Sequence, residues 1–204
     1  MEQSVIIQKR TTLSDELRTE VIRKSVHVMV ATVPGLTVLI GTAATLALLA
    51  SGTLLYTYAE VRRRQGFSIP IITRITELSS RTRDLNRFVM GPITLGIGAM
   101  LALMLYPHPA AAIAIYALAF GDGIASVVGK LFGRLEIPLT GGKTLEGSLA
   151  CTLAVAVSVF LVIPSTSVAI VVAVTAATLE ALPTHDADNL IMPVGVGLTA
   201  TFLL

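Results

Sequence analysis

The sequence has little charge and almost no cysteine. Only 14% of its 204 residues are charged, 53% are hydrophobic, and the mean hydropathy is +0.79. Soluble globular domains carry about a quarter charged residues. The composition therefore excludes an ordinary soluble domain and predicts a single integral membrane domain over residues 1–204. The one cysteine, Cys151, allows no internal disulfide and is expected to pack in a helix as a small apolar residue. Residues 1–24 hold no apolar core, so no cleavable signal peptide is expected.

Apolar segments recur along the chain at lengths close to the roughly 20 residues that a membrane-spanning helix needs. They cover residues 25–40, 42–59, 88–105, 110–128, 148–163, 167–183 and 190–204. The predicted fold is therefore all-α, a multi-pass transmembrane bundle of about seven helices. The polar tail 1–20, the loops 60–87 and 129–147 and the connector 184–189 carry the charge, whereas the connectors 33–37, 106–110 and 163–167 are short and uncharged.

The positive charge is placed on one side of this bundle. All 15 lysine and arginine residues lie in the N-terminal part up to Lys24, in 60–87 or in 129–147. If seven helices alternate in direction, these three parts meet at one face. The positive-inside rule makes that face, and the N-terminus, cytoplasmic. Chemistry that needs charge is expected there, and in a prokaryote the membrane would be the cytoplasmic membrane.

Loop 60–87 contains the pattern of an amphipathic helix that begins at Pro70. Its apolar residues recur at helical spacing opposite charged ones: Ile71, Ile75, Leu78 and Leu85 against Arg74, Glu77, Arg81 and Asp84. The pattern fits a helix lying on the inner leaflet. It fits equally a helix packed on the protein's own helices.

One carboxylate, Asp122, interrupts the apolar segment 110–128. A charge inside a membrane is costly unless it is paired, and it usually has a function. The functional interpretation is a ligand for a divalent cation that carries phosphates; the alternative is an ion pair with Arg23 or Lys24. Glu20, Lys24 and His27 share a helix face by their spacing. His27 is a candidate proton acceptor, or else a packing residue.

The segment TGGKTLEG, residues 140–147, places two glycines before Lys-Thr but lacks the first glycine of a P-loop. Gly141 and Gly142 expose backbone N–H groups, Lys143 adds a charge, and Thr144 precedes a helix. Such a helix start favours anions. Ordinary helix capping by Thr144 is the alternative.

Acidic residues also cluster in LEALPTHDADNLIMP, residues 179–193. Glu180, Asp186 and Asp188, with Asn189, would lie at one membrane level and form a candidate site for a divalent ion. Asp186 is also well placed as a helix cap. Glu60 is a further candidate, unless it pairs with Arg63 or Arg64.

Several motifs in order resemble the polyprenol kinase family, which includes dolichol kinase, phytol kinase and the CTP-dependent diacylglycerol kinases. They are RKSVH, GPITLGIG, GDGIASVVGKLFGR, GGKTLEGSLA and the C-terminal acidic segment. The resemblance runs from about residue 20 to the C-terminus. It implies a membrane enzyme that moves the terminal phosphoryl group of a nucleotide, typically CTP, to the hydroxyl of a lipid alcohol. It also implies nucleotide contacts for Lys130, Arg134, Lys143 and Thr144, and a metal role for Asp122.

On this hypothesis the acceptor is a polyprenol, a phytol-like isoprenoid or diacylglycerol. Mg²⁺ held by Asp122, with Asp188 or Glu180, bridges the phosphates of CTP. Lys130, Lys143 and the Gly141–Gly142 turn hold the rest of the nucleotide. His27 or Glu146 takes the hydroxyl proton, with Lys24 as a further member of the catalytic set. The expected partners are the nucleotide, the lipid alcohol and the bilayer. No nucleic acid is expected, and a homo-oligomer is compatible with the sequence.

Two alternatives stay open. CDP-lipid synthases, which are cytidylyltransferases, carry a related block, but Leu145 and Ser126 here replace its tryptophan and its aromatic residue. A membrane transporter is the alternative from another class, although its charges would be expected nearer the midplane.

Overall fold

The structure, a computed structural model, describes residues 13–80, 84, 87–184 and 187–204. Within them the protein is all-α, as predicted. The helices are α1 (Leu13–Met29), η1 (Val30–Thr32), α2 (Val33–Ile40), α3 (Thr42–Arg64), α4 (Pro70–Ser79), α5 (Gly91–Leu105), α6 (Ala110–Tyr116), η3 (Ala117–Asp122), α7 (Gly123–Phe132), α8 (Leu145–Val162), α9 (Thr166–Glu180) and α10 (Asp188–Leu203). Each of the seven predicted apolar segments corresponds to a helix or to a continuous series of helices.

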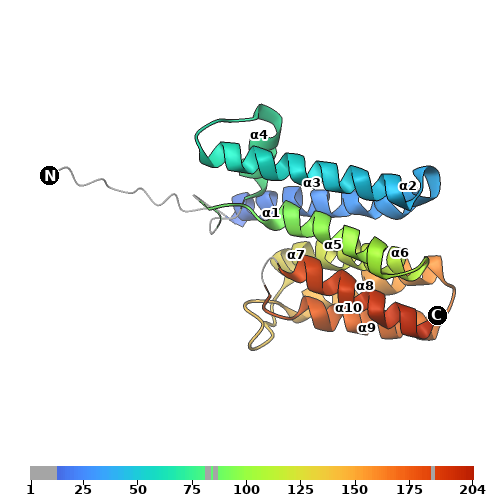
Figure 1. The fold of residues 1–204 in the computed structure, drawn as a ribbon. Helices are drawn as coiled ribbons and strands as arrows, with labels where there is room; N and C mark the ends of the chain where they lie inside the picture. Colours follow the sequence, from blue (N-terminus) through green and yellow to red (C-terminus); the bar gives the residue numbers. More distant parts are fainter. Residues whose placement is uncertain (1–12, 81–83, 85–86, 185–186) are drawn as a thin grey trace.

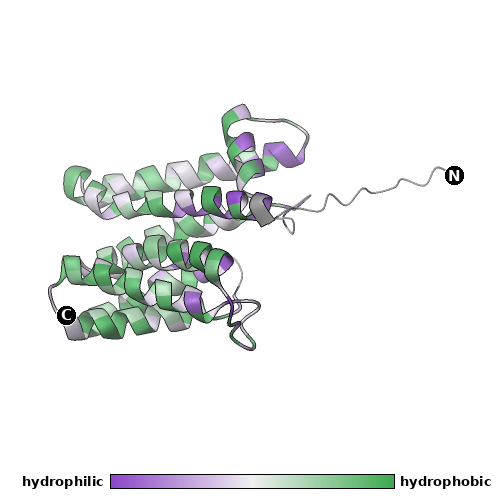
Figure 2. Cartoon of the chain, turned by 180° about the vertical axis from the view of Figure 1, so that it is seen from behind, coloured by the Kyte–Doolittle hydropathy of each residue, from purple (hydrophilic) through white to green (hydrophobic). Residues whose placement is uncertain are grey.

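The long helices run up and down between two ends of the molecule (Figure 1). One end collects the starts of α1, α5, α8 and α10, the ends of α3, α7 and α9, helix α4, and the loop 133–144. The described lysine and arginine residues all belong to these parts. Figure 2 shows the hydrophilic residues gathered at the same end, which we call the charged end.

Within the described part of the chain, two helices are long and apolar enough to cross a membrane. They are Ala110–Phe132, which joins α6, η3 and α7, and Leu145–Val162, which is α8. Length and composition alone are weak grounds for insertion, because the core helix of a soluble protein passes the same test. Helices α5, α9 and α10 are apolar but shorter.

The largest buried cluster joins α6 to α10 through small side chains. Ala117, Cys151, Val155, Ala173 and Val196 are among its fully buried members. Cys151 is therefore a buried apolar residue in a helix, as predicted. Glycines allow the closest approach: a Cβ added at Gly121 would lie 2.9 Å from Val155 Cγ2, and one at Gly147 would lie 2.9 Å from the Ala125 carbonyl oxygen. This packing holds the α7–α8 pair rigidly at the charged end.

Helix α4 starts at Pro70, as predicted, and packs against α1 and α3. Its buried face consists of the hydroxyl residues Thr73, Thr76 and Ser79. Its exposed positions hold both apolar residues, Ile71, Ile75 and Leu78, and the charged residues Arg74 and Glu77. The helix ends at Ser79, before the predicted position Leu85. Leu85, Arg81 and Arg83 lie outside the described residues.

Helix ends differ from the predicted loop boundaries in three places, because polar residues extend the helices beyond the apolar runs. Helix α1 begins at Leu13, inside the predicted tail 1–20, and α3 continues to Arg64. Helix α7 reaches Phe132, so the loop predicted over 129–147 is shorter. Sequence hydropathy marks the apolar part of a helix and says little about polar turns at its end.

Candidate functional site

A buried charge cluster forms where α1 meets the end of η3. Asp122 is 2% exposed and bonds the ammonium group of Lys24. Nδ1 of His27 lies 3.1 Å from Oδ2 of the same carboxylate. Lys24 and His27 are each 3% exposed. The pair with Lys24 is the ion pair considered as the alternative for Asp122. Lys24 and His27 lie on one face of α1, as predicted, and this face packs against Asp122.

The local backbone explains how Asp122 reaches this position. Residues Ala117–Asp122 form a wider π-helical turn between α6 and α7. Such turns inside α-helices occur frequently at functional sites. Gly121 fits against α8 with no room for a side chain. The flanking glycine therefore allows α8 to pack closely against this turn.

A second charge network lies one turn away on α1. Glu20 is fully buried and bonds the guanidinium of Arg23, while Lys130 Nζ of α7 lies 3.4 Å from Glu20 Oε2. Nε of Arg23 is buried without a hydrogen-bond partner among the described residues. Arg23 also lies near enough to Asp122 and Asp188 to feel both negative charges. It is thus a cation with donor capacity left to use.

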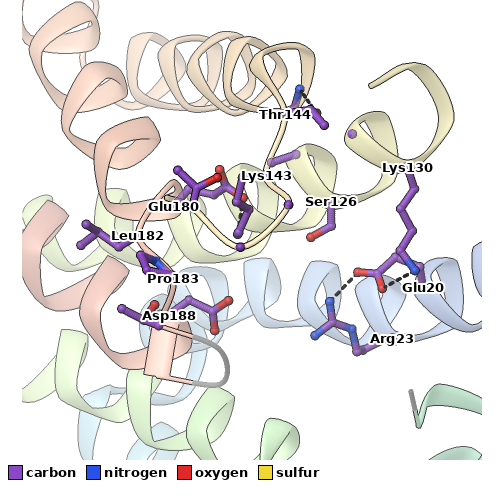
Figure 3. Close-up of a pocket in the computed structure, with 17 residues that line it drawn as sticks. Glu20, Arg23, Ser126, Lys130, Lys143, Thr144, Glu180, Leu182, Pro183 and Asp188 are labelled. Atoms are coloured by element: carbon purple, nitrogen blue, oxygen red, sulfur yellow. Dashed lines mark hydrogen bonds and ion pairs between the residues drawn. The ribbon is translucent and has the colours of Figure 1, made fainter. Parts of the chain in front are cut away.

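These networks border a pocket of about 300 Å³ at the charged end, which we call the charged pocket. Figure 3 shows Lys143, Glu180 and Asp188 on one side and Lys130, Glu20 and Arg23 on the other, with Ser126 between them. The volume lies at the lower end of the roughly 300–1,000 Å³ typical of small-molecule sites. Five α-helices (α1, α7, α8, α9 and α10) and the loop 133–144 contribute to it, so its geometry depends on the whole fold.

The loop that closes the charged pocket is built by its glycines. Gly141 and Gly142 have φ angles of 74° and 94°, a region in which other residues are strained. The Ile137 N–H donates to the Lys143 carbonyl over 2.8 Å, which ties the two arms of the loop together. Oγ1 of Thr144 accepts from the Gly147 N–H at 3.2 Å and caps α8. Thr144 therefore caps α8, which is the alternative considered for it, and it also lines the charged pocket.

Lys143 and Glu180 form an ion pair of 2.5 Å on one side of the charged pocket, although 37 positions separate them in sequence. The lysine side chain is 27% exposed and the glutamate side chain 3%. The ammonium group thus remains accessible to a ligand, while the carboxylate holds it in place.

A second pocket, of about 170 Å³, lies between α1, α3, α4 and α5. We call it the α4 pocket. Its apolar wall includes Val26, Ile72, Ile75, Val89 and Leu95. Its polar wall includes Arg23, His27, Tyr56, Thr76 and Ser79.

Arg23 lines both pockets, and His27 lines the α4 pocket. His27 Nδ1 is buried and, despite its short distance to Asp122, is turned so that it has no hydrogen-bond partner among the described residues. Buried polar atoms without partners are uncommon in native proteins and call for an explanation such as a bound group. Two of them, His27 Nδ1 and Arg23 Nε, lie where the charged pocket approaches the α4 pocket.

Some predicted site residues are not brought to either pocket. Glu146 and Arg134 lie together at a separate surface hollow beside Phe132 and Gly133. The backbone N–H of Leu135 donates to the Glu146 carboxylate over 3.4 Å, so this carboxylate is held at the surface hollow and away from both pockets.

Glu60 has the structural role considered for it. Its carboxylate accepts two bonds from Arg63, of 2.7 and 2.6 Å, and a third from the Val89 N–H at 2.8 Å. It therefore ties the end of α3 to the segment before α5. Asp186 lies outside the described residues.

The predicted magnesium ligands divide into two groups. Asp188 and Glu180 both line the charged pocket. Asp122 is buried behind it and paired with Lys24, although its charge still acts on Asp188. Among the described residues no group of three or more His, Cys, Asp or Glu side chains forms a metal cage. Mg²⁺ that travels with phosphates needs only one or two carboxylates, so Asp188 and Glu180 fit such an ion.

Sequence reasoning missed two features of the site. The spacing of Glu20 indicates its helix face but not that it joins Arg23 to Lys130. No motif indicates Tyr56 and Thr76, because hydroxyl residues in apolar helices carry no distinctive pattern. The only available signal was that Thr73, Thr76 and Ser79 recur at helical spacing in 70–79.

Comparison of the chain with family models, with curated proteins and with solved structures finds no match. The site therefore has to be interpreted from its own chemistry.

Proposed function

We propose that this protein is an integral membrane kinase that transfers the terminal phosphoryl group of a nucleotide, CTP by resemblance, to the hydroxyl of a membrane lipid alcohol. One observation carries the proposal. A cation-lined pocket and a largely apolar pocket share Arg23, beside the buried Asp122–Lys24–His27 cluster. A reaction between a water-soluble triphosphate and a lipid needs two such sites in contact.

Support for the membrane location comes from the outward faces of the helices. Large apolar side chains are exposed on α2, α3, α8 and α10, among them Val38 at 78%, Leu54 at 69%, Leu153 at 67% and Phe202 at 83%. Soluble monomers rarely expose contiguous apolar surfaces of this kind. We propose that seven helices cross the bilayer, with the charged end in the cytoplasm as the positive-inside rule requires.

Support for the nucleotide comes from the donors around the charged pocket. Lys130, Lys143 and Arg23 supply positive charge, and the Gly141–Gly142 turn adds backbone N–H groups. Phosphoryl transfer depends mainly on positioning and on neutralising phosphate charge. These groups would hold a triphosphate with its terminal phosphate towards Arg23. Mg²⁺ bound by Asp188 and Glu180 would supply further neutralisation of the phosphate oxygens.

The proton of the acceptor hydroxyl needs a base. His27 is the better candidate than Glu146, because His27 lies between the α4 pocket and Asp122 whereas Glu146 faces another hollow. The carboxylate of Asp122, 3.1 Å from His27 Nδ1, would stabilise the protonated imidazole by its charge. Lys24, which bonds the same carboxylate, keeps Asp122 ionised.

The test is an activity assay on membranes that contain the full-length protein, with CTP, Mg²⁺ and a panel of lipid alcohols. We expect a lipid monophosphate as product. Lys143→Met should raise the KM for CTP, whereas Arg64→Met, on an exposed residue that lines neither pocket, should not. Absence of product with CTP, ATP and UTP would contradict the proposal. A CDP-lipid product would favour a cytidylyltransferase, and substrate flux in proteoliposomes without product would favour a transporter.

A further inference from the structure

We infer that the α4 pocket is the binding site for the hydroxyl end of the lipid alcohol, and that helix α4 is its membrane-side wall. The inference deepens the proposed function and rests on it for the identity of the reaction. It assigns a ligand to Tyr56, Thr76 and Ser79, which take no part in nucleotide binding.

The chemistry of the pocket is graded from one side to the other. Val26, Ile72, Ile75 and Leu95 offer an apolar lining for a hydrocarbon chain. The guanidinium and imidazole groups of the polar wall, from Arg23 and His27, lie at the side that approaches the charged pocket. A molecule that complements this grading has a long apolar chain and a single polar end. A lipid alcohol meets both requirements, and a soluble metabolite does not.

Helix α4 has the reverse of the usual amphipathic arrangement, in which the apolar face is buried. Its buried face consists of Thr73, Thr76 and Ser79, while the apolar Ile71 and Leu78 are exposed beside the charged Arg74 and Glu77. An apolar face turned outwards at the charged end suits contact with the inner leaflet. The hydroxyl face turned inwards then lies over the pocket, where its oxygens are available to accept a bond from the ligand hydroxyl.

The hydroxyl groups already have internal partners, so their positions are fixed. Ser79 Oγ donates to the Ile75 carbonyl over 2.8 Å, and Tyr56 OH donates to the Val89 carbonyl over 3.3 Å. Each oxygen keeps acceptor capacity for a ligand. The unpartnered buried atom His27 Nδ1 lies beside the same pocket. A hydroxyl bound here reaches the imidazole that the proposed reaction uses as its base.

The glycine that lines this pocket provides a direct test. A Cβ added at Gly91 meets no atom within 4 Å, so a larger side chain there enters the pocket without a clash at its root. Gly52, on the exposed face of α3, has the same open surroundings and lies outside both pockets. Gly91→Leu is therefore a pocket-filling variant, and Gly52→Leu is its matched control.

The experiment uses the full-length protein in lipid nanodiscs and long-chain primary alcohols that carry a diazirine near the hydroxyl. One probe has an isoprenoid chain and the other is a diacylglycerol. After illumination, we expect the label in peptides of α4 and of the start of α5, and loss of label when unlabelled alcohol competes. The probe that labels more strongly, and whose label is lost on competition, shows whether the bound hydroxyl belongs to an isoprenoid alcohol or to a diacylglycerol.

Gly91→Leu should lower this labelling about tenfold. This is the loss of affinity expected when a ligand gives up apolar contacts equal to those of about one buried side chain. Gly52→Leu should leave the labelling at the level of the original protein. Thr76→Val, which removes one hydroxyl and keeps the shape, should raise the KM for the alcohol and leave that for CTP unchanged. This split would not arise from a general loss of folding.

Label spread evenly over lipid-facing helices, label in the loop 133–144, or equal effects of the two glycine variants would overturn the inference. Competed label at α4 in a protein that transfers no phosphoryl group would support the alcohol pocket and contradict the proposed kinase reaction. Phosphoryl transfer with label elsewhere would support the kinase and contradict the pocket. The two failures are thus distinguishable.

Discussion

Replacing Lys24 by methionine should cost more stability than any other single lysine substitution in the described chain. The pair that Lys24 makes with Asp122 is buried on both sides, each side chain being 3% exposed. Removing one partner of a buried pair leaves an uncompensated charge and costs about 3–5 kcal/mol. For a chain of this size, in which each kcal/mol shifts Tm by about 2–4 °C, this corresponds to a fall of about 6–20 °C.

The assay is a thermal unfolding series on detergent-purified Lys24→Met, Asp122→Asn and the double variant. The double variant should recover part of the loss, with a coupling energy of about 2 kcal/mol. Lys130→Met is the matched control, because the Lys130 side chain stays 34% exposed and its buried partner Glu20 also pairs with Arg23. Loss of Lys130 therefore leaves no buried charge without a partner and should cost less than loss of Lys24. Equal losses for Lys24→Met and Lys130→Met, or strict additivity in the double variant, would refute the buried pair.

Three further predictions concern helix ends, helix contacts and the base. Thr144→Ala should lower the free energy of unfolding by about 1 kcal/mol, because Thr144 caps α8, and Thr144→Ser should retain the cap; equal chemical unfolding curves for the two variants would contradict this role. Gly98→Ala should destabilise the α5–α10 contact by about 1–3 kcal/mol, because its Cβ would lie 2.0 Å from the Asn189 carbonyl oxygen; an unchanged Tm in a thermal melt would contradict it. Glu146→Gln should leave kcat within about twofold, the range of ordinary surface changes, and leave its pH profile unshifted; loss of an acidic limb in that profile would restore Glu146 as the base.

The sequence predicted the helices well, because apolar runs bounded by charge are a strong signal. It also predicted that charge collects at one end, since the positions of lysine and arginine alternate with those runs. The shared face of Glu20, Lys24 and His27 followed from helical spacing alone, and all three side chains are buried at one contact.

Pairings between distant residues could not be predicted with the same certainty. Spacing does not tell which carboxylate meets Lys143, and the structure brings Glu180 to it from 37 positions away. Asp122 was open to two interpretations, and only the packing of α1 on α7 puts Lys24 beside it. The α4 pocket could not be predicted, because its polar wall comes from three helices, each with one or two ordinary residues. Glu146 looked suitable beside Lys143 in sequence, yet the turn at the start of α8 directs it elsewhere.

The most direct test of the proposed kinase is to follow each phosphate of CTP separately. Membranes containing the protein would receive Mg²⁺, a lipid alcohol, and CTP labelled at either the γ- or the α-phosphate. The account predicts that label from the γ position, and none from the α position, enters the lipid. Label from the α position in the lipid would show nucleotidyl transfer and contradict the account.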